Sequence, residues 1–178
     1  QKAKAQELLD LVAKEIPVEK YNDPRSLSSI VTAYIVAGEE QKGIQLAEKL
    51  KKGIFDEYDY YLKLSPSFQA AARRQMRTKP MEYALVISAV TEGYRRLGQN
   101  EKAHAYLLKS VEPIDQKFNV FIKSLQQMDK EKAMKESENV QQITPFYQYL
   151  FDVMKPFDSA YSKKKEEQIT TAMIRATQ

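Results

Sequence analysis

A short pattern of residues occurs twice in this chain and strongly limits the folds available to it. An aromatic residue is followed by a glycine four positions later and by a glycine or alanine five positions after that: Tyr34, Gly38 and Gly43 first, then Tyr94, Gly98 and Ala103, at a constant offset of 60 residues. Glycine allows a tight turn at the end of a helix, and a small residue lets two helices approach closely. The pattern therefore predicts two helical hairpins with turns at Gly38 and Gly98.

The apolar residues recur with helical spacing along nearly the whole chain. Val86, Val90, Tyr94 and Leu97 form one such stripe, and no segment alternates at period two for long enough to suggest a strand. The chain has only 5 glycines and 7 prolines, too few for the frequent turns of a many-stranded fold. We therefore expect an all-α fold.

Prolines and capping residues indicate where the helices begin and end. Asp23-Pro24 and Ser65-Pro66 each pair an N-cap residue with proline at the first helical position. Pro80 and Thr144-Pro145 are also expected to open helices, and the prolines expected to end or kink one are Pro17, Pro113 and Pro156. Helices are expected near residues 2–15, 24–37, 40–64, 66–78, 80–97, 100–112, 114–136, 140–155 and 157–175.

The repeated pattern resembles the tetratricopeptide repeat, in which a tyrosine, a turn glycine and a small residue have this spacing. Ala5, Leu9, Val12 and Pro17 are similar to the second half of such a repeat, whose first helix would lie upstream of Gln1. The resemblance implies an array of antiparallel hairpins stacked as a right-handed α-solenoid. The array is expected to be irregular, because that repeat has a period of about 34 residues.

The additional length lies between the two hairpins, in a Tyr-rich segment from about residue 55 to residue 79. We expect residues 1–117 to form the repeat-like array with this segment inserted. Residues 118–178 are expected to form a helical C-terminal extension packed on the array. The buried stripe of each hairpin is expected to continue through Ala47 and Leu107, one turn beyond the small residues.

The Tyr-rich segment also carries a second resemblance. The resemblance covers the stretch from Ile44 to Phe118, in particular the run from Asp56 to Phe68, DEYDYYLKLSPSF, and the opening segment Leu8–Pro17. These parts are similar to the soluble C-terminal region of a bacterial family of multi-spanning membrane proteins. That family is of unknown function, and its membrane part resembles protein O-mannosyltransferases. The resemblance implies a fragment of a membrane-anchored parent whose C-terminal domain faces the periplasm. It brings no catalytic residue to this chain.

The composition excludes several kinds of site. The chain has no cysteine, so it forms neither disulfides nor thiolate sites, and its single histidine, His104, has no second histidine beside which it could hold a metal. His104 is therefore expected to be a solvated surface residue. No P-loop, dinucleotide-binding or zinc-protease motif occurs, so we expect no catalytic site, no cofactor and no metal in this fragment.

Two clusters could form an interaction surface. Tyr58, Tyr60 and Tyr61 lie among acidic residues, and helical spacing places Tyr58 and Tyr61 together on the buried side with Tyr60 away from them. Exposed tyrosine rings beside acids could bind carbohydrate, whereas a charged helix face with its tyrosines buried would be structural. If all three rings are buried, the carbohydrate reading fails.

The second cluster is basic, and its members are Arg73, Arg74, Arg77 and Lys79, with Arg95 and Arg96 expected nearby. Such a group could bind the anionic surface of a membrane, or it could be an ordinary solvated face. The net charge of +4 is modest and no nucleic-acid-binding module is present, so no nucleic acid is expected as a partner.

These observations predict a soluble, non-catalytic module that binds a polypeptide or a partner protein. The family resemblance implies that the module lies at the periplasmic face of the inner membrane.

 The alternatives are a free-standing adaptor of the tetratricopeptide type and a carbohydrate-binding module. Hydrophobic spans upstream of the fragment would favour a membrane-bound parent over a free-standing adaptor.

Overall fold

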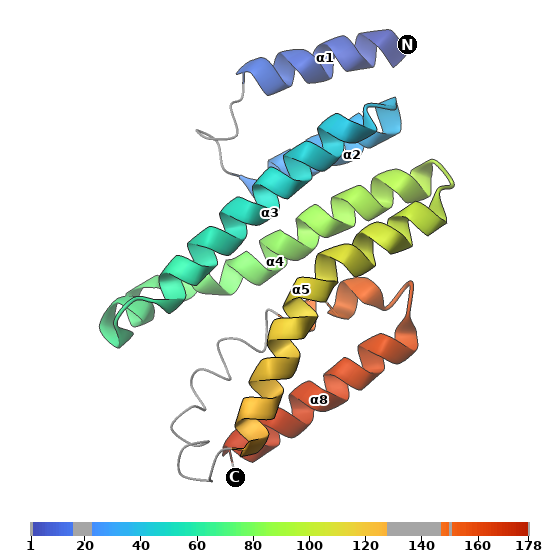
Figure 1. The fold of residues 1–178 in the computed structure, drawn as a ribbon. Coiled ribbons are helices and arrows are strands. Elements are labelled where there is room, and N and C mark those ends of the chain that lie inside the picture. Colours follow the sequence, from blue (N-terminus) through green and yellow to red (C-terminus); the bar gives the residue numbers. More distant parts are fainter. Residues whose placement is uncertain (1, 16–22, 128–146, 150, 178) are drawn as a thin grey trace. The chain divides into compact units, whose positions relative to one another are not determined.

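The computed structural model of the chain describes residues 2–15, 23–127, 147–149 and 151–177. Every regular element in these ranges is a helix (Figure 1), which confirms the expected all-α class. The chain divides into two compact units, Gln1–Leu107 and Leu108–Gln178. The sequence suggests a division after residue 117, whereas the boundary between the units falls within a helix at Leu107.

The ends of most described helices agree with the sequence expectation. The helices are α1 (Lys2–Glu15), α2 (Pro24–Ala37), α3 (Glu40–Leu62), α4 (Pro66–Arg96), α5 (Asn100–Gln127) and α8 (Ser159–Thr177). Residues 147–149 and 151–154 are also helical, and this helix ends just before Pro156, as expected. Pro17 and Thr144-Pro145 lie outside the described residues.

The two predicted N-cap residues, Asp23 and Ser65, differ in whether their side chains cap the helix. The Asp23 carboxylate accepts hydrogen bonds from the Arg25 N–H at 3.2 Å and from the Ser26 hydroxyl at 2.6 Å, so it caps α2 as predicted. Ser65 has the extended backbone of an N-cap residue, but its side chain makes no capping hydrogen bond.

Two prolines expected to break the chain into separate helices lie inside continuous ones. Pro80 is within α4 and Pro113 is within α5, so the expected helix start at Pro80 and the expected helix end at residue 112 are wrong. A proline removes one backbone hydrogen bond and costs about 3 kcal/mol in a helix interior. In α4 the buried side of the helix continues across Pro80 from Met76 to Tyr83, and this packing offsets the loss.

The turns of the two hairpins have the same geometry. Gly38 and Gly98 have φ angles of 88° and 72°, in the left-handed region that glycine adopts most readily. The N–H after each glycine donates to the carbonyl oxygen of the preceding tyrosine, from Glu39 to Tyr34 and from Gln99 to Tyr94, both at 2.9 Å. The helix-to-helix turns predicted from the repeated pattern are therefore confirmed.

The small residues of the pattern allow close packing in unit 1. Helix α4 packs against both α2 and α3. A Cβ added to Gly43 of α3 would lie 2.8 Å from Cγ1 of Ile35, and one added to Gly93 of α4 would lie 2.9 Å from Cβ of the same residue. Ile35 is fully buried, so glycine on both sides of it allows three helices to meet there.

The two hairpins also bury equivalent positions. Ala47 and Leu107 are both fully buried, as expected from the continued stripe. Buried pairs at the 60-residue offset within unit 1 are Pro24 and Ala84, Leu27 and Ile87, Val31 and Thr91, Tyr34 and Tyr94, Gly43 and Ala103, and Ala47 and Leu107. The repeat thus extends well beyond the three residues by which the sequence reveals it.

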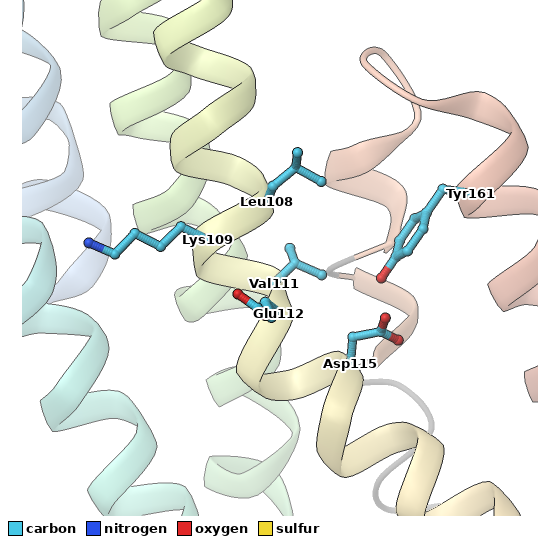
Figure 2. Close-up of a pocket in the computed structure, with 6 residues that line it drawn as sticks. All are labelled: Leu108, Lys109, Val111, Glu112, Asp115 and Tyr161. Carbon is cyan, nitrogen blue, oxygen red and sulfur yellow. The ribbon is translucent and has the colours of Figure 1, made fainter.

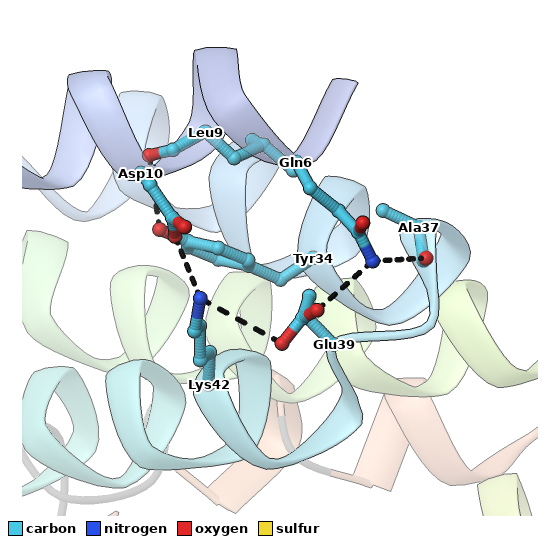
Figure 3. A network of polar contacts seen from close by, with 7 residues as sticks. All are labelled: Gln6, Leu9, Asp10, Tyr34, Ala37, Glu39 and Lys42. Atoms are coloured by element: carbon cyan, nitrogen blue, oxygen red, sulfur yellow. Dashed lines mark hydrogen bonds and ion pairs between the residues drawn. The ribbon is translucent and has the colours of Figure 1, made fainter. Parts of the chain in front are cut away.

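The tyrosine of each hairpin is bonded to the helix that precedes that hairpin. Figure 3 shows the first case, in which the Tyr34 hydroxyl donates to the Leu9 carbonyl oxygen at 2.9 Å and Lys42 forms an ion pair with Asp10 at 2.7 Å. Both partners are on α1. In the second case, the Tyr94 hydroxyl and Lys102 both bond the carboxylate of Glu40 on α3, at 2.9 and 2.8 Å.

Unit 2 has a core of its own. Phe151 and Met154 are fully buried, and the ring of Tyr161 on α8 packs edge-on against Phe151 with 5.7 Å between the ring centroids. The fully buried Ser162 donates to the Phe151 carbonyl oxygen at 2.7 Å. The start of α8 is fixed by Asp158, whose side chain accepts from the Tyr161 N–H at 2.9 Å.

Candidate interaction surfaces

The segment expected to be an insertion is the far end of the α3–α4 hairpin. Helix α2 has 14 residues, whereas α3 has 23 and α4 has 31, so the second half of α3 and the first half of α4 extend past the start of α2 (Figure 1). Nine residues of α3, 54–62, correspond to roughly 13 Å of helix. We call residues 60–68, where α3 turns into α4, the hairpin tip.

The three tyrosines near this tip have different environments. Tyr58 is 6% exposed and belongs to the core of the hairpin, while Tyr60 is 60% exposed. Tyr61 is half-buried, and its hydroxyl donates to Glu57 at 3.0 Å. Tyr60 lies away from the buried side, as the spacing predicts, but its ring is not separate from Tyr61, since the two ring centroids are 5.8 Å apart. Tyr58 cannot offer a ring face to a ligand, so Tyr60 is the accessible ring of the three.

A buried ion pair lies inside the same hairpin. Lys79 is 9% exposed and its ammonium contacts Glu57 at 2.7 Å and Glu82 at 3.0 Å. Burial by itself lowers the pKa of Lys79, but the hydrogen bonds to the two carboxylates outweigh it and the pKa is raised. The sequence groups Lys79 with a solvent-facing basic cluster. This grouping is wrong, because Lys79 is on the side of α4 that faces α3.

The arginines expected in the same basic cluster also lie in different places along α4. Arg74 is exposed, and the side chains of Arg73 and Arg77 are outside the described part of the chain. Arg95 and Arg96 are at the opposite end of α4, where both contact Glu92. Eighteen residues of continuous helix separate Arg77 from Arg95, which is roughly 27 Å. The expectation that these arginines lie together is wrong, because α4 continues through Pro80.

Sequence reasoning missed an exposed aromatic residue at the hairpin tip. Phe68, in the first turn of α4, is 67% exposed. Its position two residues after Pro66 could have revealed it, since the first turn of a helix that follows a tight turn is often solvated. Tyr60 and Phe68 therefore both present rings to solvent near the α3–α4 turn.

The first helices of the two hairpins also carry exposed residues. Val36 on α2 and Leu85 on α4 are exposed hydrophobic residues. Arg25 and Ser29 are also exposed on α2, and Glu92 on α4 is half-buried. We call these five residues the first-helix surface. The Thr32 hydroxyl, which donates to the Ala89 carbonyl oxygen at 2.8 Å, bonds α2 to α4.

Unit 2 contains an open pocket of about 390 Å³. Figure 2 shows its lining residues, which are Leu108, Lys109, Val111, Glu112 and Asp115 of α5 and Tyr161 of α8. The Tyr161 hydroxyl points toward Asp115. Burial and the neighbouring Asp115 carboxylate raise the pKa of Tyr161 well above its usual range.

Asp115, which lines this pocket, is also bound by a buried lysine. Lys165 is 5% exposed, forms an ion pair with Asp115 and donates to Asn119 at 3.2 Å. Its ammonium also lies over the Tyr161 ring, 5.4 Å from the centroid. Although Lys165 lies in a run of charged residues, 163–167, it is buried because it occupies the side of α8 that faces α5.

Among the described residues, no three His, Asp or Glu side chains are grouped so as to hold a metal ion. His104 is half-buried with its Nε2 enclosed, so the expectation of a solvated histidine is wrong. The reason is its place on α5, directly after the buried Ala103 and three residues before the buried Leu107.

Comparisons with known proteins add no assignment. No protein-family model matches this chain, and neither a curated protein nor a solved structure matches it significantly. None of the helices in the described ranges combines the length and the apolar character needed to cross a membrane.

Proposed function

We propose that this chain is a non-catalytic protein-interaction module whose first unit is a tetratricopeptide-like array of helical hairpins. The observation that supports this most directly is the repeated bonding between each hairpin and the helix before it. The side chains of Tyr34 and Lys42 bind residues of α1, and those of Tyr94 and Lys102 bind Glu40 of α3. Arrays in which each hairpin contacts its neighbours in the same way present extended surfaces to polypeptides.

The partner in this proposal is a polypeptide that docks on the first-helix surface. In stacked hairpin arrays the first helices line one continuous face, and here they carry exposed Val36 and Leu85 among polar residues. Apolar anchors surrounded by polar groups are typical of surfaces that bind extended chains or helices of a partner.

We further propose that the module belongs to a membrane-bound, glycosyltransferase-like parent and faces the periplasm. The resemblance of the Asp56–Phe68 run and of the opening helix to that membrane-protein family supports this proposal. In such a parent, the module would hold an acceptor polypeptide or a partner subunit beside the membrane active site. The helical C-terminal extension would then be specific to this protein.

Site-specific photocrosslinking in the full-length parent tests this function. A photoreactive amino acid placed at Val36 or Leu85 is expected to yield crosslinked polypeptides in membranes. The same group at Lys163, an exposed residue of α8 in unit 2, is the matched control and is expected to yield none.

A charge substitution provides the second arm of this test. Val36→Asp with Leu85→Asp should abolish crosslinking from a neighbouring probe at Ser29, because a desolvated carboxylate opposes docking of an apolar partner. Both residues are exposed, so the fold should tolerate the change. If crosslinks are equally strong from Ser29 and Lys163, or survive the double substitution, the proposed interaction surface is wrong.

A further inference from the structure

The hairpin tip and the helix segments that lead to it contain most of the excess positive charge of the chain. Residues 52–79 contain six Lys or Arg and three Asp or Glu, a formal charge of +3, while the whole chain is +4. The side-chain contacts of the described residues show how the acidic residues of this segment are paired.

Each of the three acidic residues in the segment is paired with a lysine. Asp56 is bound by Lys52 at 2.5 Å and Asp59 by Lys63 at 2.6 Å, while Glu57 is bound by Lys79 at 2.7 Å. Three acids and three lysines thus compensate one another. The other three basic residues of the segment are Arg73, Arg74 and Arg77, which lie within five residues of one another on α4. Of these, Arg74 has a described side chain, and it is exposed.

Two aromatic rings are exposed at the end of the same hairpin. Tyr60 and Phe68 are 60% and 67% exposed and flank the α3–α4 turn. Aromatic side chains favour the boundary between lipid headgroups and acyl chains, where the ring leaves water and a phenolic hydroxyl remains hydrated. Within unit 1 this end projects past the start of α2 (Figure 1), so a flat surface can reach it without contacting α2.

We infer that the hairpin tip binds the surface of an anionic lipid membrane. Tyr60 and Phe68 enter the headgroup region, and the arginine turn contacts lipid phosphates. Each basic residue near an anionic surface raises membrane affinity by about a factor of five. The inference does not depend on polypeptide binding by the first-helix surface, since the two surfaces share no residue.

An acidic polypeptide is the competing ligand for a basic surface, and the exposed rings argue against it. A partner that is bound by charge alone would gain no affinity from the two exposed rings at the end of the hairpin. Lipid headgroups with acyl chains beneath them match both features at once.

A fluorescence experiment tests the membrane contact directly. The chain has no tryptophan, so Phe68→Trp introduces a single reporter at the tip. Vesicles containing phosphatidylglycerol should shift its emission to shorter wavelength, and vesicles of phosphatidylcholine alone should not. Leu97→Trp, at the exposed far end of α4, is the matched control and should show no shift.

Sedimentation with the same vesicles measures the contribution of each feature. Replacing Arg73, Arg74 and Arg77 with Ala should reduce affinity at least ten-fold. The control removes three exposed positive charges from unit 2, by Lys123→Ala, Lys163→Ala and Lys164→Ala, and should reduce it less than three-fold. Tyr60→Ser with Phe68→Ser should remove the part of the binding that persists at high salt.

Three results would overturn the inference. Equal losses in the arginine variant and the lysine control would mean that net charge alone attracts the chain to vesicles. An unshifted Phe68→Trp spectrum with bound vesicles would exclude the tip as the contact. Binding to polyglutamate without binding to vesicles would assign the surface to an acidic polypeptide instead.

Discussion

The Cβ of Ile35 lies 2.9 Å from the position that a Cβ on Gly93 would occupy. Helices α2 and α4 can therefore approach as closely as they do only because residue 93 has no side chain. Ile35 is β-branched and fully buried, so it cannot move aside by a simple rotation. The contact joins the two hairpins of unit 1 at their first helices.

We expect Gly93→Ala to destabilise unit 1 by about 1–3 kcal/mol, because overpacking forces these helices apart. Urea denaturation followed by circular dichroism measures the effect. Gly98→Ala is the comparison, since nothing lies within 4 Å of its added Cβ but its φ is 72°. It should cost about 1–2 kcal/mol from backbone strain alone. A Gly93→Ala protein as stable as the parent would contradict the close-packing account.

The two repeat tyrosines should differ in their importance for stability. The Tyr94 hydroxyl bonds the carboxylate of Glu40, whereas the Tyr34 hydroxyl bonds the backbone carbonyl oxygen of Leu9. Hydrogen bonds to charged groups contribute about 1.5–3 kcal/mol, and neutral ones about 0.5–1.5 kcal/mol. Because Glu40 also binds Lys102 and is partly exposed, we expect Tyr94→Phe to cost about 1.5 kcal/mol and Tyr34→Phe about 1 kcal/mol or less. Chemical denaturation of both variants measures the order, and a larger loss for Tyr34→Phe would contradict it.

The protein should lose stability in alkaline solution between about pH 10 and pH 12. Burial raises the pKa of Tyr58 to about 12 and, with a smaller effect of Glu48, that of Tyr83 to about 12. Since the folded state holds these protons more tightly than the unfolded state, their stabilisation is complete below pH 10. It is lost as the pH rises toward 12.

Each of these two tyrosines should contribute on the order of 2 kcal/mol to this pH dependence. The measurement is the free energy of unfolding as a function of pH, with tyrosinate absorbance recorded alongside. Tyr83→Phe should flatten the profile, while Tyr60→Phe, at an exposed ring, should leave it unchanged. An identical alkaline slope in Tyr83→Phe and the parent would contradict the assignment.

Among the described charged residues of unit 2, Lys165 should be the one whose substitution costs the most stability. It is buried against Asp115, Asn119 and the Tyr161 ring, so Lys165→Ala leaves the Asp115 carboxylate without its cation. Breaking a buried pair in this way costs about 3 kcal/mol or more. Hydrogen exchange of the α8 amides measures the loss within unit 2.

Two variants serve as controls for the Lys165 substitution. Lys164→Ala, next to it but exposed, should change stability by less than about 0.5 kcal/mol. Lys165→Met with Asp115→Leu should recover much of the loss, because an apolar pair of similar volume removes the unpaired charge. No recovery in the double variant would indicate that packing of the lysine stem, and not charge, is what matters.

Local features of the fold could be predicted from the sequence because they depend on residues close together in the chain. The cap at Asp23 depends on one carboxylate, and the turns at Gly38 and Gly98 depend on the positive φ angles that glycine adopts because it lacks a Cβ. Helical spacing likewise predicted which of the neighbouring tyrosines is buried, since Tyr58 and Tyr60 point to different sides of a single helix. For the hairpin tip, the sequence predicted which tyrosine is buried and which is exposed, and nothing further.

The sequence by itself determined the helical class, the two hairpin turns and the burial of the repeated positions. Only the tertiary structure decided that α4 continues through Pro80, which separates Arg77 from Arg95, and that Lys79 and Lys165 are buried. Proline is disfavoured in a helix interior, and lysine is disfavoured in a protein core. Predictions from the sequence rest on these local preferences. Whether packing and a carboxylate partner outweigh it depends on residues far away in the chain, such as Glu57 for Lys79 and Asp115 for Lys165.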